Sequence, residues 1–588
     1  MAITSDTPIS TKQTETPIDL HANPVPRPLA LARRHAALLF VLAVFLLSTF
    51  VIPVLAPVVT TDDWSYSRSA QILLTEGRLT IFPVVVATAI VPVAWGALFG
   101  LVLGPDVGVF RLSTVVMTAI GGLALYGLCR ELGVSRGRGA LGVATFLFNP
   151  LVFVLAFTFM TDPHFVAWMT IAVWLFARSI RPDDIDPRFV AAGATVAALA
   201  FLTRHQGALI APAVVVALLL AHRLRLDRAG LRLAALALAP TVVAITAYAV
   251  WARSGNDATM QGTFVREIAQ AGWDGTWWLV RWLPVFALAY VGFFVLPITV
   301  AAFPADHYLV RRMSRRGWIL WGGVAAVIGI GVTILAARGS LMPYLPQFAG
   351  PTGLGPPDVL AGRPQLLGPE ARPLVTLAVL ASTLLLALAL AGRMTLPAST
   401  QRSRAALVLS VAITQGAGVL PPSYHFLGWS AGSVDRYLLP LAPLTIALAL
   451  WALRGIPLTI PFGWTVVALL AAVSIVGTRD YLTFMEAIWS LGDEAVAAGV
   501  PLDRLDAGAG WDGYYLYERG LAGNIAPRTK DGPWWVYMNG PATDSTYAVA
   551  SAPVPGYDVI AERTYSSWLL GADPPLYLLR RQGEPGPP

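Results

Sequence analysis

Long runs of apolar residues, separated by short polar segments, dominate the chain from about residue 36 to about residue 477. Most of these runs approach the roughly 20 residues that an α-helix needs to cross the hydrocarbon core of a bilayer. The last segment, from about residue 478, is polar and aromatic and is interrupted by glycines and prolines. The pattern predicts an all-α polytopic membrane protein with a small soluble domain at its carboxyl end.

Arginine-rich loops help to decide which apolar runs cross the membrane. If the run at about 81–104 crosses, most later arginine-rich loops fall on the outer side; if it lies in the interface, they fall inside. Arginines favour the cytoplasmic side of a membrane, so we adopt the interfacial placement, with the amino terminus cytoplasmic. The clusters placed inside are Arg130, Arg136 and Arg138; Arg178, Arg181 and Arg188; Arg223, Arg225, Arg228 and Arg232; Arg311, Arg312, Arg315 and Arg316; and Arg393, Arg402 and Arg404.

This topology divides the chain into three parts. A disordered cytoplasmic tail covers residues 1–34, a membrane domain covers 35–477 with a first outer loop at 60–108, and a soluble outer domain covers 478–588. About thirteen crossings are expected by the length rule. They lie at about 36–60, 109–128, 139–157, 164–179, 188–203, 207–222, 232–252, 279–302, 318–336, 373–391, 405–420, 437–453 and 457–476.

Composition agrees with a membrane protein. The 588 residues are 56% hydrophobic and 13% charged, with a mean hydropathy of +0.64. The net charge of +7 comes from arginines spread over short loops, and no basic domain for nucleic acid is indicated. The single cysteine, Cys129, excludes an internal disulfide.

The terminal segment predicts a small mixed α/β domain. It opens with a helical pattern at 481–498 and continues with strand-like runs at 514–517, 534–538, 547–549 and 576–580, which glycines and prolines separate.

Three acidic residues stand at the outer ends of spans. Asp62 and Asp63 follow the first apolar run, and Asp162 lies in a short polar break between two later runs. Residues 62–77 predict a short amphipathic helix along the membrane surface, with Tyr66 on its apolar face. The aspartates are either helix caps or acid/base groups, and one of an adjacent pair can cap while the other reacts.

Two arginines also lie on the predicted outer face. Arg204 breaks the rule that arginines go inside, and a lipid phosphate, an ordinary headgroup or an aspartate would each explain it. Arg436 has the same placement, with Asp435 beside it as a local ion-pair partner. His164 and His205 are possible substrate contacts, although His164 also suits a structural hydrogen bond. Three scattered aspartates do not support a divalent-cation site.

Together these residues resemble the integral-membrane GT-C glycosyltransferases. The similarity is greatest to the bacterial branch of RgtA/B/C/D-like enzymes, which is related to the protein O-mannosyltransferases and the lipid A aminoarabinose transferase. It covers the first half of the chain most specifically. The segments that carry it are the acidic pair followed by Tyr66 and Ala70; Met160-Thr161-Asp162; Leu202-Thr203-Arg204 with Gly207 and Pro212; and Asp435-Arg436-Tyr437-Leu438-Leu439-Pro440.

The resemblance implies a polyprenyl-phosphate sugar as donor and inversion at the sugar carbon without an essential metal or other cofactor. Asp62 matches the catalytic aspartate, Asp63 its acidic neighbour and Asp162 the acid of the second outer loop. Arg204 stands where relatives often carry lysine before a glycine, but here two residues precede Gly207. The expected acceptor is a glycan, lipid or protein outside a bacterial cytoplasmic membrane.

The sequence therefore predicts a hexosyl or pentosyl transferase, with Asp62 or Asp63 as base and with Arg204 and Arg436 on the donor phosphate. The alternative is a transporter or flippase of lipid-linked substrates, which would carry ionisable residues in the middle of its spans. Convergence of Asp62, Asp63, Asp162 and Arg204 on one outward cavity distinguishes the two.

Overall fold

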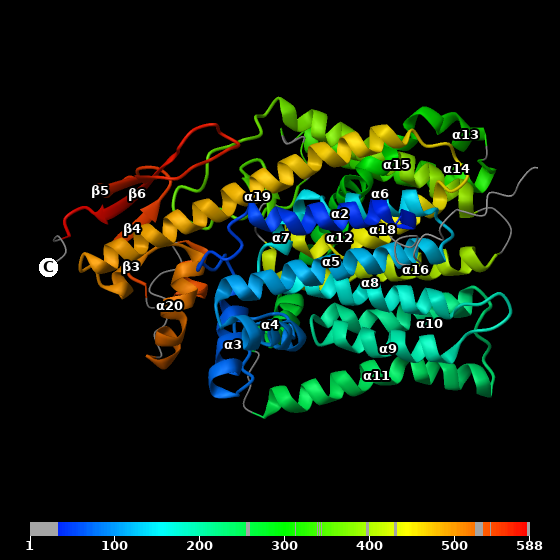
Figure 1. Ribbon diagram of the computed structural model, residues 1–588, viewed down its shortest axis with the longest axis horizontal. Coiled ribbons are helices and arrows are strands. Elements are labelled where there is room, and N and C mark those ends of the chain that lie inside the picture. Colours follow the sequence, from blue (N-terminus) through cyan, green and yellow to red (C-terminus); the bar gives the residue numbers. More distant parts are fainter. Residues whose placement is uncertain are drawn as a thin grey trace, which may run out of the picture.

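The computed structural model describes residues 33–254, 259–311, 313–337, 339, 342, 344–394, 399–427, 432–523, 533–540 and 543–584. The predicted tail at 1–34 lies outside these residues except for its last two positions. Long helices lie side by side in a bundle, and a smaller domain with strands sits at one end of it (Figure 1).

Seven of the described helices are long and apolar enough to cross a membrane, or eight if one bent pair counts as a span. These findings make the chain a multi-pass membrane protein; the number of thirteen crossings stays a prediction. The seven spans contain α5 (Val107–Glu131), α11 (Arg228–Arg253), α12 (Thr259–Ala302), α14 (Arg315–Ala337), α15 (Ala371–Met394), α16 (Thr400–Ala417) and α19 (Ile460–Ala497). Shorter apolar helices include α2 (Ala36–Leu47), α4 (Ile90–Leu103), α9 (Pro187–Phe201), α10 (Ile210–Leu220) and α18 (Leu441–Ala452).

The predicted span at 139–157 is broken. Helices α6 (Arg136–Leu147) and α7 (Pro150–Ala156) meet at an angle of 66°. Pro150 begins α7 because its missing N–H is not needed at a first helical position. The Asn149 side chain accepts a hydrogen bond from the Leu151 N–H at 3.2 Å and caps the new helix. The chain thereby turns just before Asp162 and α8 (Thr161–Ser179).

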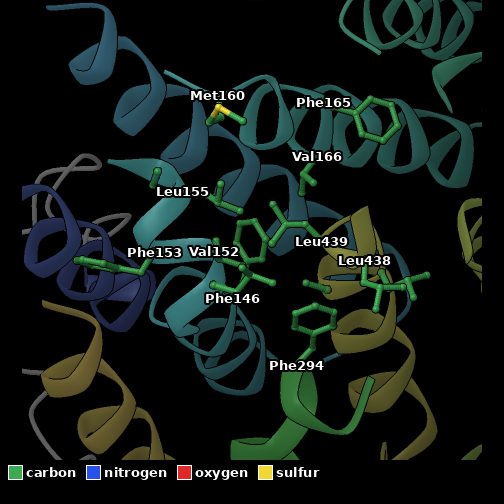
Figure 2. Close-up of a cluster of buried hydrophobic side chains, with 14 of the residues drawn as sticks. Phe146, Val152, Phe153, Leu155, Met160, Phe165, Val166, Phe294, Leu438 and Leu439 are labelled. Carbon is green, nitrogen blue, oxygen red and sulfur yellow. The ribbon is translucent and has the colours of Figure 1, made fainter. Parts of the chain in front are cut away.

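Bulky side chains fill the space around this bend (Figure 2). Phe146 and Phe153, from the two arms of the bend, are buried with Phe294 of α12 and with Leu438 and Leu439. Phe153 packs edge-on to Phe45 of α2 at 5.7 Å between ring centroids. Such close packing holds the short segment from α7 to α8 in one position.

Described arginines from two of the clusters assigned to one side of the membrane lie at one end of the bundle (Figure 1). Arg404 donates to the carbonyls of Glu131 and Ile180, and Arg223 donates to the carbonyl of Pro182 at 2.6 Å. The helices α3 (Asp63–Glu76) and α4 of the first outer loop lie at the opposite end (Figure 1). Placement of this end of the bundle in the cytoplasm stays a prediction.

Helix α19 runs without a break from the bundle into the terminal domain, so the predicted boundary at 477/478 falls inside a single helix. The domain adds α20 (Ala509–Ala522), α21 (Trp534–Met538) and a four-stranded sheet of order β3-β4-β6-β5. These strands are Leu505–Asp506, Tyr547–Ala550, Pro575–Arg581 and Tyr557–Thr564, in that order.

The α/β class of this domain is confirmed, but two of its predicted strands are wrong. Residues 514–517 lie in helix α20 and residues 534–538 form helix α21. Both runs are rich in aromatic residues, which favour strands only where a sheet accommodates them. In α20 the buried Leu516 and Tyr517 belong to a helix that packs on α3, and this contact decides the conformation.

The terminal domain is tightly docked on the first outer loop. Tyr517 of α20 packs on Trp64 of α3 at 4.9 Å between ring centroids, and Arg68 pairs with Glu518 at 2.8 Å. A Cβ atom at Gly513 would lie 2.2 Å from Nε1 of Trp64. Only glycine therefore allows the two helices to approach this closely.

Replacing Gly513 by Ala should destabilise this docking by about 1–3 kcal/mol, because a rigid indole has to move. A lower melting temperature in detergent and earlier proteolysis of the terminal domain would report the effect. Gly137→Ala is the matched control, since nothing lies within 4 Å of the added atom. If Gly513→Ala and Gly137→Ala have the same melting temperature, the approach of Gly513 to Trp64 does not require glycine.

Candidate functional site

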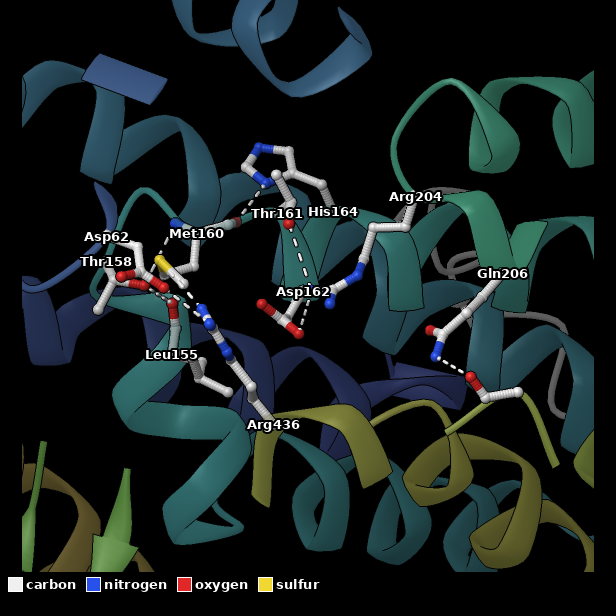
Figure 3. A network of polar contacts seen from close by, with 11 residues as sticks. Asp62, Leu155, Thr158, Met160, Thr161, Asp162, His164, Arg204, Gln206 and Arg436 are labelled. Atoms are coloured by element: carbon white, nitrogen blue, oxygen red, sulfur yellow. Dashed lines mark hydrogen bonds and ion pairs between the residues drawn. The ribbon is translucent and has the colours of Figure 1, made fainter. Parts of the chain in front are cut away.

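Two ion pairs connect elements that are far apart in the sequence. Arg436 Nη2 donates to Asp62 Oδ2 at 2.7 Å, and Arg204 Nη1 donates to Asp162 Oδ1 (Figure 3). Both guanidinium groups lie over the ring of Tyr437, at 5.6 Å for Arg436 and 5.3 Å for Arg204. The structure thus brings two positive and two negative groups around one tyrosine.

Asp63 fixes the start of helix α3. Its carboxylate accepts hydrogen bonds from the N–H and the hydroxyl of Thr60, three residues earlier, as the acidic member of a capping box does. It also accepts the N–H of Phe159 at 3.2 Å and so ties the first outer loop to the second. Burial raises the pKa of Asp63 to about 6, and the positive charge of Arg111 offsets part of this shift.

Arg111 of α5, itself buried, holds the segment that precedes this cap. Its guanidinium donates to the carbonyl of Val54 at 2.8 Å and to the carbonyl of Val58. With Asp63 turned inward by these contacts, its neighbour Asp62 faces the other way, toward Arg436. The same local backbone therefore lets Asp63 fix the start of α3 and leaves Asp62 facing Arg436.

Arg204 stands at the turn between α9 and the short 3-10 helix His205–Leu209. Gly207 makes this turn possible, because a Cβ there would lie 2.2 Å from the backbone nitrogen of Phe201. Arg204 also reaches the Thr161 hydroxyl at 3.3 Å, while Asp162 Oδ2 has no hydrogen-bond partner among the described residues. Asp162 therefore holds Arg204 against the start of α8.

A cavity of about 360 Å³ opens on this network. Asp62, Tyr66, Arg204 and Arg436 line it, together with Tyr437. Apolar residues 84–86 of the first outer loop form another part of the wall, and the terminal domain contributes through α21. The combination of a few charged groups with apolar walls is typical of a binding site.

The predicted site residues separate into three groups. Asp62, Tyr66, Arg204 and Arg436 line the cavity. Asp63 and Asp162 do not line it, but each holds a residue or segment that does. The two histidines form the third group.

Neither His164 nor His205 lines the cavity. His164 is buried and its Nδ1 donates to the carbonyl of Met160 at 3.1 Å, which is a structural hydrogen bond. His205 is exposed and packs near Phe201 and Tyr248. Substrate contact by these two histidines has no support in this geometry.

The predicted local ion pair of Asp435 with Arg436 is wrong. Asp435 instead accepts the N–H groups of Phe348 at 2.8 Å and Ala349 at 2.7 Å, in the loop before α15. Its partner in the sequence, Arg436, turns to Asp62. Burial raises the pKa of Asp435 to about 7, and those N–H groups oppose the shift. Asp435 thus attaches a wall of the cavity to the segment that carries Arg436.

Sequence analysis missed further polar groups of the cavity, among them His425, Arg372 and Asp358. His425 Nδ1 lies 2.8 Å from Glu267 Oε1. Asp358 lies in a loop of glycines and prolines between α14 and α15, where no periodicity marks a functional residue. Asp358 is recognised as part of the site because it lines the same cavity as Asp62. A single sequence does not show that these two residues share a cavity.

The buried pair of Asp162 and Arg204 should show strong energetic coupling. Asp162→Asn and Arg204→Met should each destabilise the protein by about 3–5 kcal/mol, because each leaves a buried charge without its partner. The double variant should recover much of this loss. Melting temperatures of the four proteins measure the coupling. Glu518→Gln, at a half-exposed pair, serves as a control with an effect within about 1 kcal/mol. If the destabilisation of the double variant equals the sum of the two single effects, Asp162 and Arg204 are not coupled.

Comparison with known proteins supports the resemblance drawn from the motifs. Residues 88–251 match the family described as dolichyl-phosphate-mannose-protein mannosyltransferase. No curated protein sequence matches the chain significantly. The matched segment includes Asp162 and Arg204. Over these residues the chain is therefore similar to a mannosyltransferase family, in agreement with the resemblance drawn from the motifs.

Two solved structures are similar to this chain. ArnT from Cupriavidus metallidurans, bound to undecaprenyl phosphate, has 14% sequence identity and a TM-score of 0.40, with 94% of this chain and 99% of that chain covered. The apo form of the Archaeoglobus fulgidus oligosaccharyltransferase has 13% identity and a TM-score of 0.37, with 76% of this chain and 55% of that chain covered.

Proposed function

We propose that the protein transfers a hexose or pentose from a polyprenyl-phosphate donor to a hydroxyl group of a cell-envelope glycan, lipid or protein. The observation that carries this proposal is the cavity in which Asp62 lies beside Arg436, with Arg204 across the ring of Tyr437. A carboxylate suits proton removal, and two guanidinium groups suit a phosphate. The family match at 88–251 favours the same donor class.

The mechanism is a direct displacement at the anomeric carbon. Asp62 removes the proton of the acceptor hydroxyl while its oxygen attacks the sugar. The bond from the sugar carbon to the phosphate oxygen breaks, and its electron pair leaves with the polyprenyl phosphate. Arg436 and Arg204 stabilise the charge that develops on this phosphate, an effect that grows as water is excluded.

Arg436 has two tasks in this scheme. It bonds Asp62 Oδ2 at 2.7 Å, and its side chain is only 9% exposed. A guanidinium carries five N–H donors, so it can bind a phosphate and keep its contact with Asp62. Asp162 is a positioning residue, since it touches Arg204 and does not line the cavity. With positive charge supplied by arginines, the scheme uses no metal ion.

The proposed location is the outer face of a bacterial cytoplasmic membrane. The arginine clusters lie at the end of the bundle away from α3, and cytoplasmic placement of these clusters puts the cavity outside. The amino terminus is then cytoplasmic and the terminal domain faces the cell envelope. A lipid-linked donor would enter the cavity from the bilayer.

Purified protein in nanodiscs, incubated with undecaprenyl-phosphate hexoses and pentoses and with glycan, lipid and protein fractions of the envelope, tests the proposal. Mass spectrometry should detect one acceptor class that gains one sugar. Movement of the donor across vesicle membranes without any product would instead support the transporter alternative.

A further inference from the structure

One carboxyl group of the cavity has no role in the scheme above. Asp358 lines the cavity with Asp62 and Arg436, and its Oδ2 atom is shielded from solvent. By distance and angle, none of the described residues hydrogen-bonds this oxygen, the nearby Thr61 hydroxyl included, and Asp358 forms no ion pair with them. A buried polar atom without a partner is uncommon in a native structure and indicates a ligand or a catalytic task.

The backbone around Asp358 is fixed by the terminal domain. Its carbonyl accepts the N–H of Ala509 at 3.1 Å, and Gly508 packs so closely that a Cβ there would lie 2.4 Å from the same carbonyl oxygen. The φ angle of Asp358 is 24°, in the left-handed region that few residues other than glycine, asparagine and aspartate adopt. An aspartate held in this way is positioned by its surroundings.

Asp62 and Asp358 have opposite electrostatic environments. Asp62 bonds directly to the guanidinium of Arg436 at 2.7 Å. Burial raises the pKa of Asp358 to about 7; the negative charge of Asp62 adds to the shift, while the Thr61 hydroxyl and Arg436 oppose it. On the side of α19, the group that faces Asp358 is the neutral phenol of Tyr481. Two carboxyl groups with such different environments are suited to opposite roles, one as base and one as acid.

We propose that Asp358 is a catalytic acid that donates its proton to the departing phosphate, while Asp62 accepts the proton of the acceptor hydroxyl. This inference rests on the proposed glycosyl transfer. As the sugar–oxygen bond breaks, the phosphate oxygen keeps the electron pair and forms a new O–H bond with the proton of Asp358. The products are the glycosylated acceptor, the singly protonated polyprenyl phosphate, protonated Asp62 and ionised Asp358.

The cycle closes with one proton transfer. The proton gained by Asp62 returns to Asp358, directly or through water in the cavity, and both residues regain their starting states. No oxidant, reductant or other reactant is needed. The net effect is that the proton of the acceptor hydroxyl leaves with the polyprenyl phosphate.

Asp358→Asn tests the proposal, because asparagine tolerates the left-handed backbone and has nearly the same shape. Transfer from a polyprenyl-phosphate donor should fall by about 10²-fold or more, as expected for the loss of a positioned acid. The matched control is Glu370→Gln, an exposed acid of the same loop, which should keep full activity. Melting temperature and binding of undecaprenyl phosphate should stay unchanged in both variants.

Two further measurements separate an acid from a structural residue. In the wild type, transfer should decline as the pH rises above about 7, because Asp358 loses the proton that it has to donate. This decline should be absent from the residual activity of Asp358→Asn. A donor with a diphosphate leaving group depends less on protonation, so the variant should be within about tenfold of the wild type on that donor.

The outcomes are distinct. If the wild type transfers sugar, Asp62→Asn is inactive and Asp358→Asn is fully active, this inference fails and the proposed function stands. The inference also fails if Asp358→Asn loses the same factor in transfer rate on the monophosphate and the diphosphate donor and its pH profile matches that of the wild type. If the wild type transfers no sugar from any polyprenyl donor, the proposed function fails and the acid role fails with it.

Discussion

Replacing Asp62 by Asn should reduce sugar transfer by about 10²- to 10⁴-fold, the usual contribution of a positioned base. Asparagine preserves the shape of the side chain but accepts no proton. The Asp62 side chain is 30% exposed and forms no helix-capping hydrogen bond, so the loss of its pair with Arg436 should destabilise the fold less than Asp162→Asn does. Initial rates with a polyprenyl-phosphate donor, alongside the melting temperature, measure the two effects separately.

Glu76→Gln is the matched control for Asp62→Asn. Glu76 is the last residue of the same helix and forms an exposed pair with Arg78 at 2.9 Å, so its loss should leave transfer unchanged. Asp63→Asn provides a contrast, because it should disturb the start of α3 by weakening the contacts to Thr60. Full activity of a correctly inserted Asp62→Asn variant would remove Asp62 from the role of base.

Replacing Arg436 by Gln should produce the second large effect. The variant loses a charged donor to the phosphate, and we expect transfer to fall by about 10²- to 10³-fold, as when one preorganised donor is removed from a transition state. Affinity for undecaprenyl phosphate should fall by about tenfold or more, since a hydrogen bond to a charged group contributes about 1.5–3 kcal/mol. Titration of fluorescent undecaprenyl phosphate and initial rates measure these changes.

Arg436→Lys keeps the charge but loses the planar set of donors, so its rate and affinity should lie between those of the wild type and Arg436→Gln. Arg78→Gln, at an exposed position, is the control and should bind the lipid like the wild type. A variant without Arg436 that binds and transfers normally would show that the donor phosphate lies elsewhere.

The sequence predicted the class of the fold and three charged residues of the cavity, Asp62, Arg204 and Arg436, but not how they pair. Apolar runs near 20 residues mark spans because the bilayer imposes that length. Asp62 and Arg436 are 374 positions apart, and their contact depends on the packing of the whole bundle. The adjacent Asp435 was the nearer partner in the sequence, yet the backbone of another loop binds it.

Two other differences have physical causes of the same kind. The aromatic run at 514–517 is helical because α20 packs on Trp64, a contact that local propensity does not include. Asp358 escaped notice because its loop has no regular pattern, and its position depends on Gly508 of the terminal domain. Residues that act through distant contacts are therefore the ones that a single sequence does not reveal.

A cryo-electron microscopy structure of the protein with undecaprenyl phosphate would show directly which groups bind the donor phosphate. We expect the phosphate within hydrogen-bonding distance of Arg436 and Arg204, next to Asp62, with the polyprenyl chain leading from the cavity to the bilayer. Phosphate density away from both arginines, or an empty cavity at saturating lipid, would contradict the account.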